Sequence, residues 1–219
     1  MSITQTLIEL DPTLGIHNEG EWSNTISPYS AFNSGGVECE VGEFLYAFLR
    51  MTKPGCVLET GTHYGIGASY MGMALKENKG GHLDTIEFLQ PIYDVAKERI
   101  RKLGLDEYVT CHFGDVKDFE PKMKKYQFIL LDTEPDIRFG EFLKFYPYLD
   151  EGGYMFIHDL GRGLGQVQSP NLPFAWPFGV LPDGMVQLMK DHKIRPFHFS
   201  TPRGLSGFYK VHEGDYKYE

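Results

Sequence analysis

The sequence is poor in cysteine and has no long apolar run. Its three cysteines, Cys39, Cys56 and Cys111, stand far apart and form no metal-binding pair, which is typical of free thiols in a reducing compartment. No segment approaches the ~20 apolar residues of a membrane-spanning helix, and the first residues lack the basic start of a secretory signal. We therefore predict a cytoplasmic protein with no membrane partner.

Basic residues are outnumbered by acidic ones. Lysine and arginine total 21 against 30 aspartates and glutamates, which gives a formal net charge of -9. Nucleic acids would repel such a chain at long range, so we expect no nucleic-acid partner. The sequence does contain 42% hydrophobic residues over 219 positions, enough to bury the core of one globular domain.

Hydrophobic patterning predicts an arm followed by a domain of alternating helices and strands. Residues 1–36 are interpreted as an irregular but ordered N-terminal arm, and residues 37–219 as one domain. Apolar spacing and Gly and Pro stops predict helices over 40–50, 68–78, 91–103, 138–147 and 183–192, strands over 56–59, 82–87, 108–113, 126–131 and 153–158, and a terminal hairpin of 194–200 and 205–211. This alternation predicts an α/β fold with a doubly wound, mostly parallel, seven-stranded sheet.

Acidic residues stand at or just after the ends of the predicted strands. They are Glu59, Glu87, Asp115, Asp132 and Asp159. Ligands of parallel α/β sheets bind outside the carboxyl ends of the strands. These acids are therefore the first candidates for a ligand site.

The turn after the first strand of this sheet combines an acid with glycines. The backbone can approach a ligand closely at Gly61, Gly65 and Gly67. The spacing of these glycines differs from G-x-G-x-x-G, which disfavours a dinucleotide cofactor and hence a dinucleotide-dependent oxidoreductase. Glu59 would repel a pyrophosphate and attract an ammonium group. Glu87, at the end of the next strand, is placed to accept hydrogen bonds from ribose hydroxyls. A ligand with an ammonium group, a carboxylate and a ribose is an aminoacyl nucleoside.

Motifs along residues 41–160 resemble those of class I S-adenosylmethionine-dependent methyltransferases, most closely the catechol O-methyltransferase-like branch and its macrocin-type relatives. The similar segments are LETGTHYGIGAS, TIEFLQPIYDVAKERIRKLGL, HFGD, LLDTEPD and GGYMFIHDL. The resemblance implies S-adenosylmethionine as cofactor and an antiparallel last strand. It also implies these cofactor-binding residues: Glu59, Gly61, Thr62, His63, Gly67, Ser69 and Asp132 near the methionine part, Glu87 at the ribose, and Gly114 and Asp115 at the adenine.

A second site is predicted where two neighbouring strands end. The carboxylates of Asp132 and Asp159 are expected to converge on one hard cation such as Mg²⁺. The chain departs from the pattern of the branch, because Leu160 replaces an asparagine, His158 replaces a glutamate, and Pro135 replaces the lysine base. In the alternative interpretation no metal binds, Asp132 faces the cofactor amine and Asp159 caps the next loop.

Together these features predict methyl transfer to a hydroxyl group of a small molecule, with Mg²⁺ as an optional second cofactor. His158 and Asp132 are the candidate catalytic residues, because an imidazole with a pKa near ~6.5 takes up a proton at neutral pH. The alternatives are a buried structural role for His158, a metal-independent N-methyltransferase and a non-catalytic cofactor-binding protein.

Related folds pair through the arm, so a homo-oligomer is expected. The predicted walls of the acceptor pocket are Trp22, Tyr29, Phe32, Phe174, Trp176 and Phe178.

Overall fold

The computed structural model describes residues 1–19, 29–123, 125–159, 181–199 and 201–212. Their main feature is a seven-stranded sheet in the order β5-β4-β3-β6-β7-β9-β8. Its strands are β3 (Cys56–Thr60), β4 (His82–Glu87), β5 (Val109–Phe113), β6 (Tyr126–Leu131), β7 (Leu149–His158), β8 (Ile194–Phe199) and β9 (Leu205–Lys210). The strands β3 to β7 pair in parallel, whereas β9 is antiparallel to both β7 and β8. The predicted doubly wound, mostly parallel sheet is confirmed.

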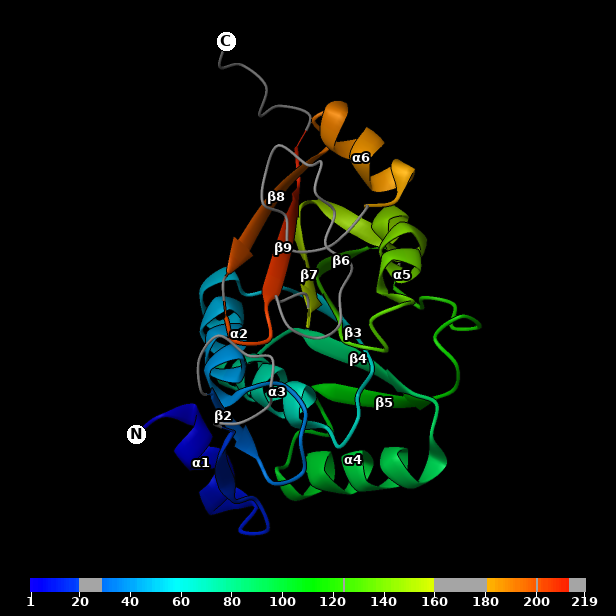
Figure 1. Ribbon diagram of the computed structural model, residues 1–219. Coiled ribbons are helices and arrows are strands. Elements are labelled where there is room, and N and C mark those ends of the chain that lie inside the picture. Colours follow the sequence, from blue (N-terminus) through cyan, green and yellow to red (C-terminus); the bar gives the residue numbers. More distant parts are fainter. Residues whose placement is uncertain (20–28, 124, 160–180, 200, 213–219) are drawn as a thin grey trace.

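Alternating side chains of the central strands build a hydrophobic core on each face of the sheet. On β3, Val57 points into one core and Leu58 into the other, and the same alternation follows along β6. The first core is covered by α2 (Cys39–Thr52), α3 (Ile66–Asn78) and α4 (Gln90–Lys102), and the second by α5 (Arg138–Phe145) and α6 (Asp183–Lys190) (Figure 1). Continuous apolar strands are thus explained by burial on both sides.

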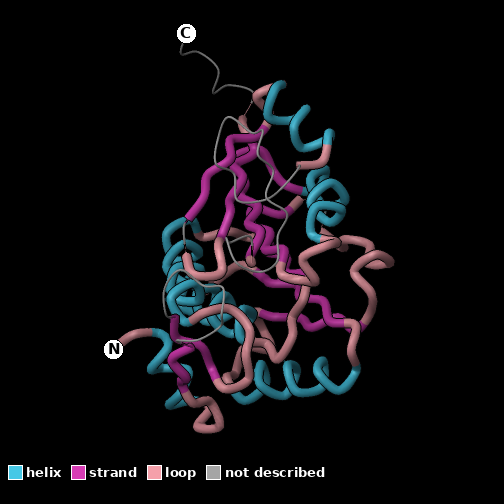
Figure 2. Tube along the Cα trace, viewed as in Figure 1, coloured by secondary structure: helices cyan, strands magenta, loops and turns pink. Residues whose placement is uncertain are grey.

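The N-terminal arm was predicted to be irregular, and this prediction was wrong. It contains α1 (Ile3–Leu10) and a two-stranded antiparallel sheet of β1 (Ile16–Glu19) and β2 (Tyr29–Phe32) (Figure 2). The hydroxyl of Ser2 accepts a hydrogen bond from the backbone N–H of Gln5 and caps α1. Leu7 is fully buried in the core beneath α2 and α3. The arm therefore packs as part of the domain's first core.

Other boundaries differ by a few residues. The last strand of the parallel set, β7, begins at Leu149 and not at residue 153, directly after the 3-10 turn Tyr146–Tyr148. None of the helices in the described part of the chain has the length and apolar character needed to cross a bilayer.

Candidate active site

The turn from β3 to α3, here called the glycine loop (residues 61–65), is held in a conformation that only some residues tolerate. Gly61 and Gly65 have φ values of 79° and 81°, and His63 has a φ of 49°. A Cβ atom at Gly61 would collide with the backbone carbonyl of Asp132 at the end of β6. Glycine is required there because the loop crosses the neighbouring strand end at close range.

Glu87 fixes this loop to the end of β4. Its carboxylate accepts hydrogen bonds from the backbone N–H groups of His63 at 2.9 Å, Phe88 at 3.0 Å and Leu89 at 2.9 Å. These bonds make one rigid corner from the glycine loop and the turn into α4. The side chain is nearly buried, yet it lines the cavity described next.

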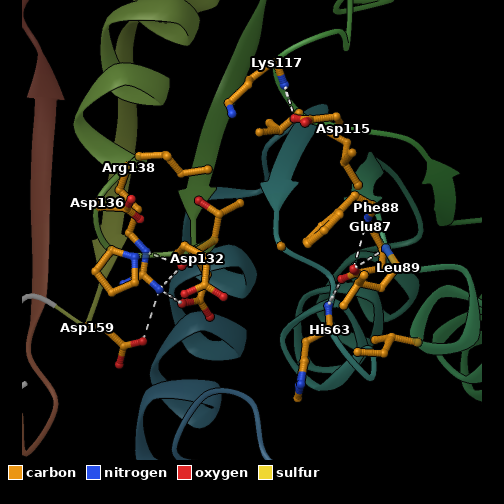
Figure 3. Close-up of a pocket in the computed structure, with 18 of the residues that line it drawn as sticks. His63, Glu87, Phe88, Leu89, Asp115, Lys117, Asp132, Asp136, Arg138 and Asp159 are labelled. Atoms are coloured by element: carbon orange, nitrogen blue, oxygen red, sulfur yellow. Dashed lines mark hydrogen bonds and ion pairs between the residues drawn. The ribbon is translucent and has the colours of Figure 1, made fainter.

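A cavity of about 520 Å³ opens at the carboxyl ends of the parallel strands (Figure 3). Figure 3 shows two sides of it: His63, Glu87, Phe88 and Leu89 lie on one, and Asp132, Arg138 and Asp159 on the other. Of the predicted site residues, the cavity is lined by Gly61, His63, Glu87, Gly114, Asp115, Asp132 and Asp159. The structure therefore brings the two predicted sites together in one cavity.

Four predicted cofactor residues, Glu59, Thr62, Gly67 and Ser69, lie behind the cavity wall. The Glu59 carboxylate accepts a hydrogen bond of 2.6 Å from the Thr85 hydroxyl. Burial raises the pKa of Glu59 to about 8, which favours the protonated carboxyl over the carboxylate. The Ser69 hydroxyl donates to the carbonyl of Gly65 at 2.6 Å. Thr62 belongs to the glycine loop and its hydroxyl lies 2.5 Å from that of Thr85, whereas the other three residues lie behind the loop. Contact of any of the four with a cofactor stays a prediction.

The other side of the cavity is built on six interlocked charged residues, which we call the ionic cluster. They are Glu38, Asp132, Arg138, His158, Asp159 and Arg203. His158 lies at its centre, fully buried, with Nε2 2.6 Å from Glu38 and Nδ1 3.0 Å from Asp132. Burial alone would lower the pKa of His158, but the carboxylates of Asp159, Asp132 and Glu38 raise it to about 10.

Two arginines bind the predicted metal-ligand carboxylates. Nη2 of Arg138 lies 3.2 Å from both Asp132 and Asp159, and the Arg203 guanidinium contacts both oxygens of Asp159, at 2.6 and 2.8 Å. Burial would raise the pKa of Asp159, but the neighbouring cations His158, Arg203 and Arg138 lower it to about 2. Sequence reasoning missed Glu38, Arg138 and Arg203, because positions 38, 138 and 203 belong to no common motif.

The ionic cluster decides whether Mg²⁺ fits. One ligand atom each from Asp132, His158 and Asp159 lie within 4.8 Å of one another, which is a suitable distance for one cation. The carboxylates, however, already contact permanently charged guanidinium groups, and an imidazole is a poor ligand for Mg²⁺, which prefers oxygen. The residues present therefore do not fit a Mg²⁺ ion, and the geometry does not favour the predicted metal role of Asp132 and Asp159.

The predicted acceptor walls are placed only in part. Tyr29 and Phe32 are buried, and Phe32 packs 6.1 Å from the ring of Tyr70, so neither lines the cavity. The remaining predicted wall residues, Trp22, Phe174, Trp176 and Phe178, lie outside the described residues, as does Leu160. Pro135, which occupies the position of the lysine base in the resembled branch, does line the cavity.

The strand order and the cavity at the strand ends define a class I methyltransferase fold. Residues 58–160 match the family model of a methyltransferase domain. The chain is similar in fold to the Podospora anserina methyltransferase PaMTH1 with bound S-adenosylhomocysteine (18% identity, 82% of this chain and 81% of that chain, TM-score 0.65). It is also similar to the O-methyltransferase TomG of Streptomyces achromogenes in complex with S-adenosylmethionine (18% identity, 81% and 82% coverage, TM-score 0.64).

A curated relative matches over a shorter stretch. The protein-L-isoaspartate O-methyltransferase of Thermosipho melanesiensis is 39% identical over 62 residues, which is 28% of this chain and 30% of that protein. The alignment thus spans less than a third of the relative. Taken together, these findings show a methyltransferase domain over residues 58–160 and the fold of class I methyltransferases for the described chain.

Proposed function

We propose that this chain transfers the methyl group of S-adenosylmethionine to a hydroxyl oxygen of a small molecule. One observation carries the proposal: a single cavity has the corner built around Glu87 on one side and the carboxylate of Asp132, held by buried cations, on the other. Methyl transfer needs both, because its rate depends on holding an acceptor in line with the methyl group and the sulfur. The choice of oxygen is supported by relatives that are named O-methyltransferases.

The corner around Glu87 suits the nucleoside. In the proposed pose the carboxylate of Glu87, already fixed by three backbone N–H groups, accepts the ribose hydroxyls. Phe88 is 57% exposed and Leu89 43% exposed, although both are apolar, and both line the cavity. We assign the adenine ring to these side chains, with Gly114 and Asp115 at its edge, because an adenine would cover their apolar surface.

The methionine part is assigned to the glycine loop. Gly61 and His63 line the cavity there, and the loop backbone can pack directly against the end of β6 because Gly61 has no side chain. Carboxylates on the cavity lining, including Glu87, Asp115 and Asp132, favour a ligand that carries a sulfonium and an ammonium charge. The positive charge of the sulfonium is lost on transfer, so this field favours the substrate cofactor over its product.

Asp132 is the proposed catalytic residue on the acceptor side. It lines the cavity, and its contacts with His158 and Arg138 both use Oδ1. We assign its Oδ2 to the acceptor hydroxyl, which it orients and from which it takes the proton as the methyl group moves. His158 is fully buried and is assigned a positioning role through Asp132.

Formation of S-adenosylhomocysteine tests the proposal. The purified chain is incubated with S-adenosylmethionine and two matched panels of small molecules, one with hydroxyl and one with amine acceptors. We expect turnover with hydroxyl compounds, and a fall in kcat of ~100-fold or more in Asp132→Asn, measured at saturating cofactor. Turnover with amines alone would establish the N-methyltransferase alternative. Cofactor binding without turnover on either panel would favour the non-catalytic alternative.

A further inference from the structure

Arg99 is a buried arginine on α4, a helix whose other charged residues are exposed. It lies on α4 between Glu98 and Arg101, which both face solvent, yet only 7% of Arg99 is exposed. A buried guanidinium is costly unless its N–H groups are bound. Nε of Arg99 lies 3.2 Å from the carboxylate of Asp11, which is itself 3% exposed and ends α1. The pair thus joins the N-terminal arm to α4.

The other end of Arg99 reaches the glycine loop. Its Nη1 donates a hydrogen bond to the backbone carbonyl of Tyr64. Tyr64 stands between two residues with positive φ, His63 and Gly65. A residue other than glycine keeps a positive φ only where surrounding hydrogen bonds and packing hold the backbone in that conformation. His63, which directly precedes Tyr64, lines the cavity and donates its backbone N–H to the carboxylate of Glu87.

We propose that Arg99, oriented by Asp11 of the arm, is a positioning residue that holds the glycine loop in its cofactor-binding shape. The chain of contacts runs from Asp11 through Arg99 and Tyr64 to His63 and Glu87. The planar guanidinium of Arg99 binds the carboxylate of Asp11 and the carbonyl of Tyr64 at the same time. The position of the arm therefore fixes the position of the glycine loop. This role rests on the proposed cofactor site.

Asp11 is needed because other acids line the cavity next to the Asp11–Arg99 pair. A second cavity, of about 350 Å³, adjoins the pair and is also lined by Asp94 and Glu98. Without the Asp11 carboxylate, we expect the guanidinium to turn toward Asp94, since Glu98 already pairs with Arg101, and the bond to the Tyr64 carbonyl to be lost. The loop is then free to leave the shape that places His63 beside Glu87.

The test measures binding of S-adenosylhomocysteine by calorimetry on the full chain, together with steady-state kinetics and thermal unfolding of each variant. Asp11→Asn and Arg99→Met are compared with Arg101→Met, a matched control whose ion pair with Glu98 lies exposed on the same helix. Arg99→Lys keeps the charge but not the planar fork. If Arg99→Met does not fold, Asp11→Asn and Arg99→Lys carry the test.

We expect the Kd and the KM for the cofactor to rise by ~10-fold in Asp11→Asn and Arg99→Met, and by less in Arg99→Lys, with kcat at saturating cofactor unchanged. Arg101→Met should match the wild type. Wild-type affinity in folded Asp11→Asn and Arg99 variants would overturn the positioning role, as would a lower kcat with unchanged Kd. A wild-type chain that binds no cofactor would instead refute the proposed function.

Discussion

At the scale of single residues, the site depends on buried arginines that belong to no recognisable sequence motif. Arg138 is almost fully buried and binds the backbone carbonyls of Thr133 and His158 as well as the carboxylates of Asp132 and Asp159. It therefore ties the ends of β6 and β7 together. Its removal leaves buried carboxylates short of a positive partner, which is among the most costly changes a core can undergo.

Substitution of Arg138 should consequently destabilise the whole domain. We expect Arg138→Met to lower the free energy of unfolding by about 3 to 5 kcal/mol in urea denaturation. The control Arg195→Met lies at an exposed position on β8 and should change it by less than about 0.5 kcal/mol. A loss below about 1 kcal/mol in Arg138→Met would show that the ionic cluster does not need this charge.

Removal of metal ions tests the same cluster in a different way. Since guanidinium groups already contact Asp132 and Asp159, we expect full methyl transfer after dialysis against a chelator, with no gain on addition of Mg²⁺ or Mn²⁺. The measurement is the rate of S-adenosylhomocysteine formation before and after dialysis. Loss of activity that a divalent ion restores would place a cation among Asp132, His158 and Asp159 and disprove this interpretation.

At the scale of elements, the contact between the glycine loop and the end of β6 shapes the cavity. Gly61→Ala places a Cβ against the carbonyl of Asp132 at a φ of 79°, which alanine adopts only with strain. We expect a loss of about 2 to 4 kcal/mol in stability and weaker cofactor binding, measured by denaturation and calorimetry. The helical Gly140 has open space around it, so Gly140→Ala should be neutral or stabilising by about 0.5 to 1 kcal/mol. Equal stability of the two variants would contradict the argument.

Elements with a strong internal pattern were predictable from the sequence, and those defined by long-range packing were not. Periodic apolar residues located α2 to α5 and β3 to β6 to within about two residues. The arm was misjudged because α1 has only 8 residues and is stabilised by packing on α2 and α3. The position of Glu87 at the cavity could be predicted from the acids at strand ends. The ionic cluster could not, because Glu38, Arg138 and Arg203 come together only through the topology of the fold.

At the scale of the whole molecule, a buried acid links stability to pH. Burial raises the pKa of Glu59 from 4.5 to about 8, so between these values the folded chain holds a proton that the unfolded chain has released. Because the folded chain binds more protons than the unfolded chain in this window, the free energy of unfolding falls as the pH rises through it. Glu59→Gln cannot ionise and lacks this contribution.

We therefore expect Glu59→Gln to gain stability relative to the wild type as pH rises from about 5 to about 8, and the difference to level off above that range. Urea denaturation of both proteins across the range measures it. Because other titrating groups are common to both proteins, their effects cancel in the difference. A stability difference that does not change with pH would show that Glu59 is ionised throughout.

The assembly and surroundings of the molecule stay predictions. The resemblance to related folds implies a homo-oligomer formed through the arm, and the composition predicts a cytoplasmic location and no nucleic-acid partner. Light scattering of the purified chain gives its oligomeric state. The arm's described part packs on α2 and α3 of its own chain, so an oligomer formed through the arm must use its outer surface.

The most direct test of the whole account is a calorimetric titration of S-adenosylmethionine into the wild type, Glu87→Ala and the control Glu107→Ala, whose side chain is exposed. Glu87 accepts three backbone hydrogen bonds and, in the proposed pose, the ribose hydroxyls. The account predicts binding to the wild type and to Glu107→Ala, with at least ~10-fold weaker binding to Glu87→Ala. Equal affinity in Glu87→Ala, or no binding to the wild type, would contradict it.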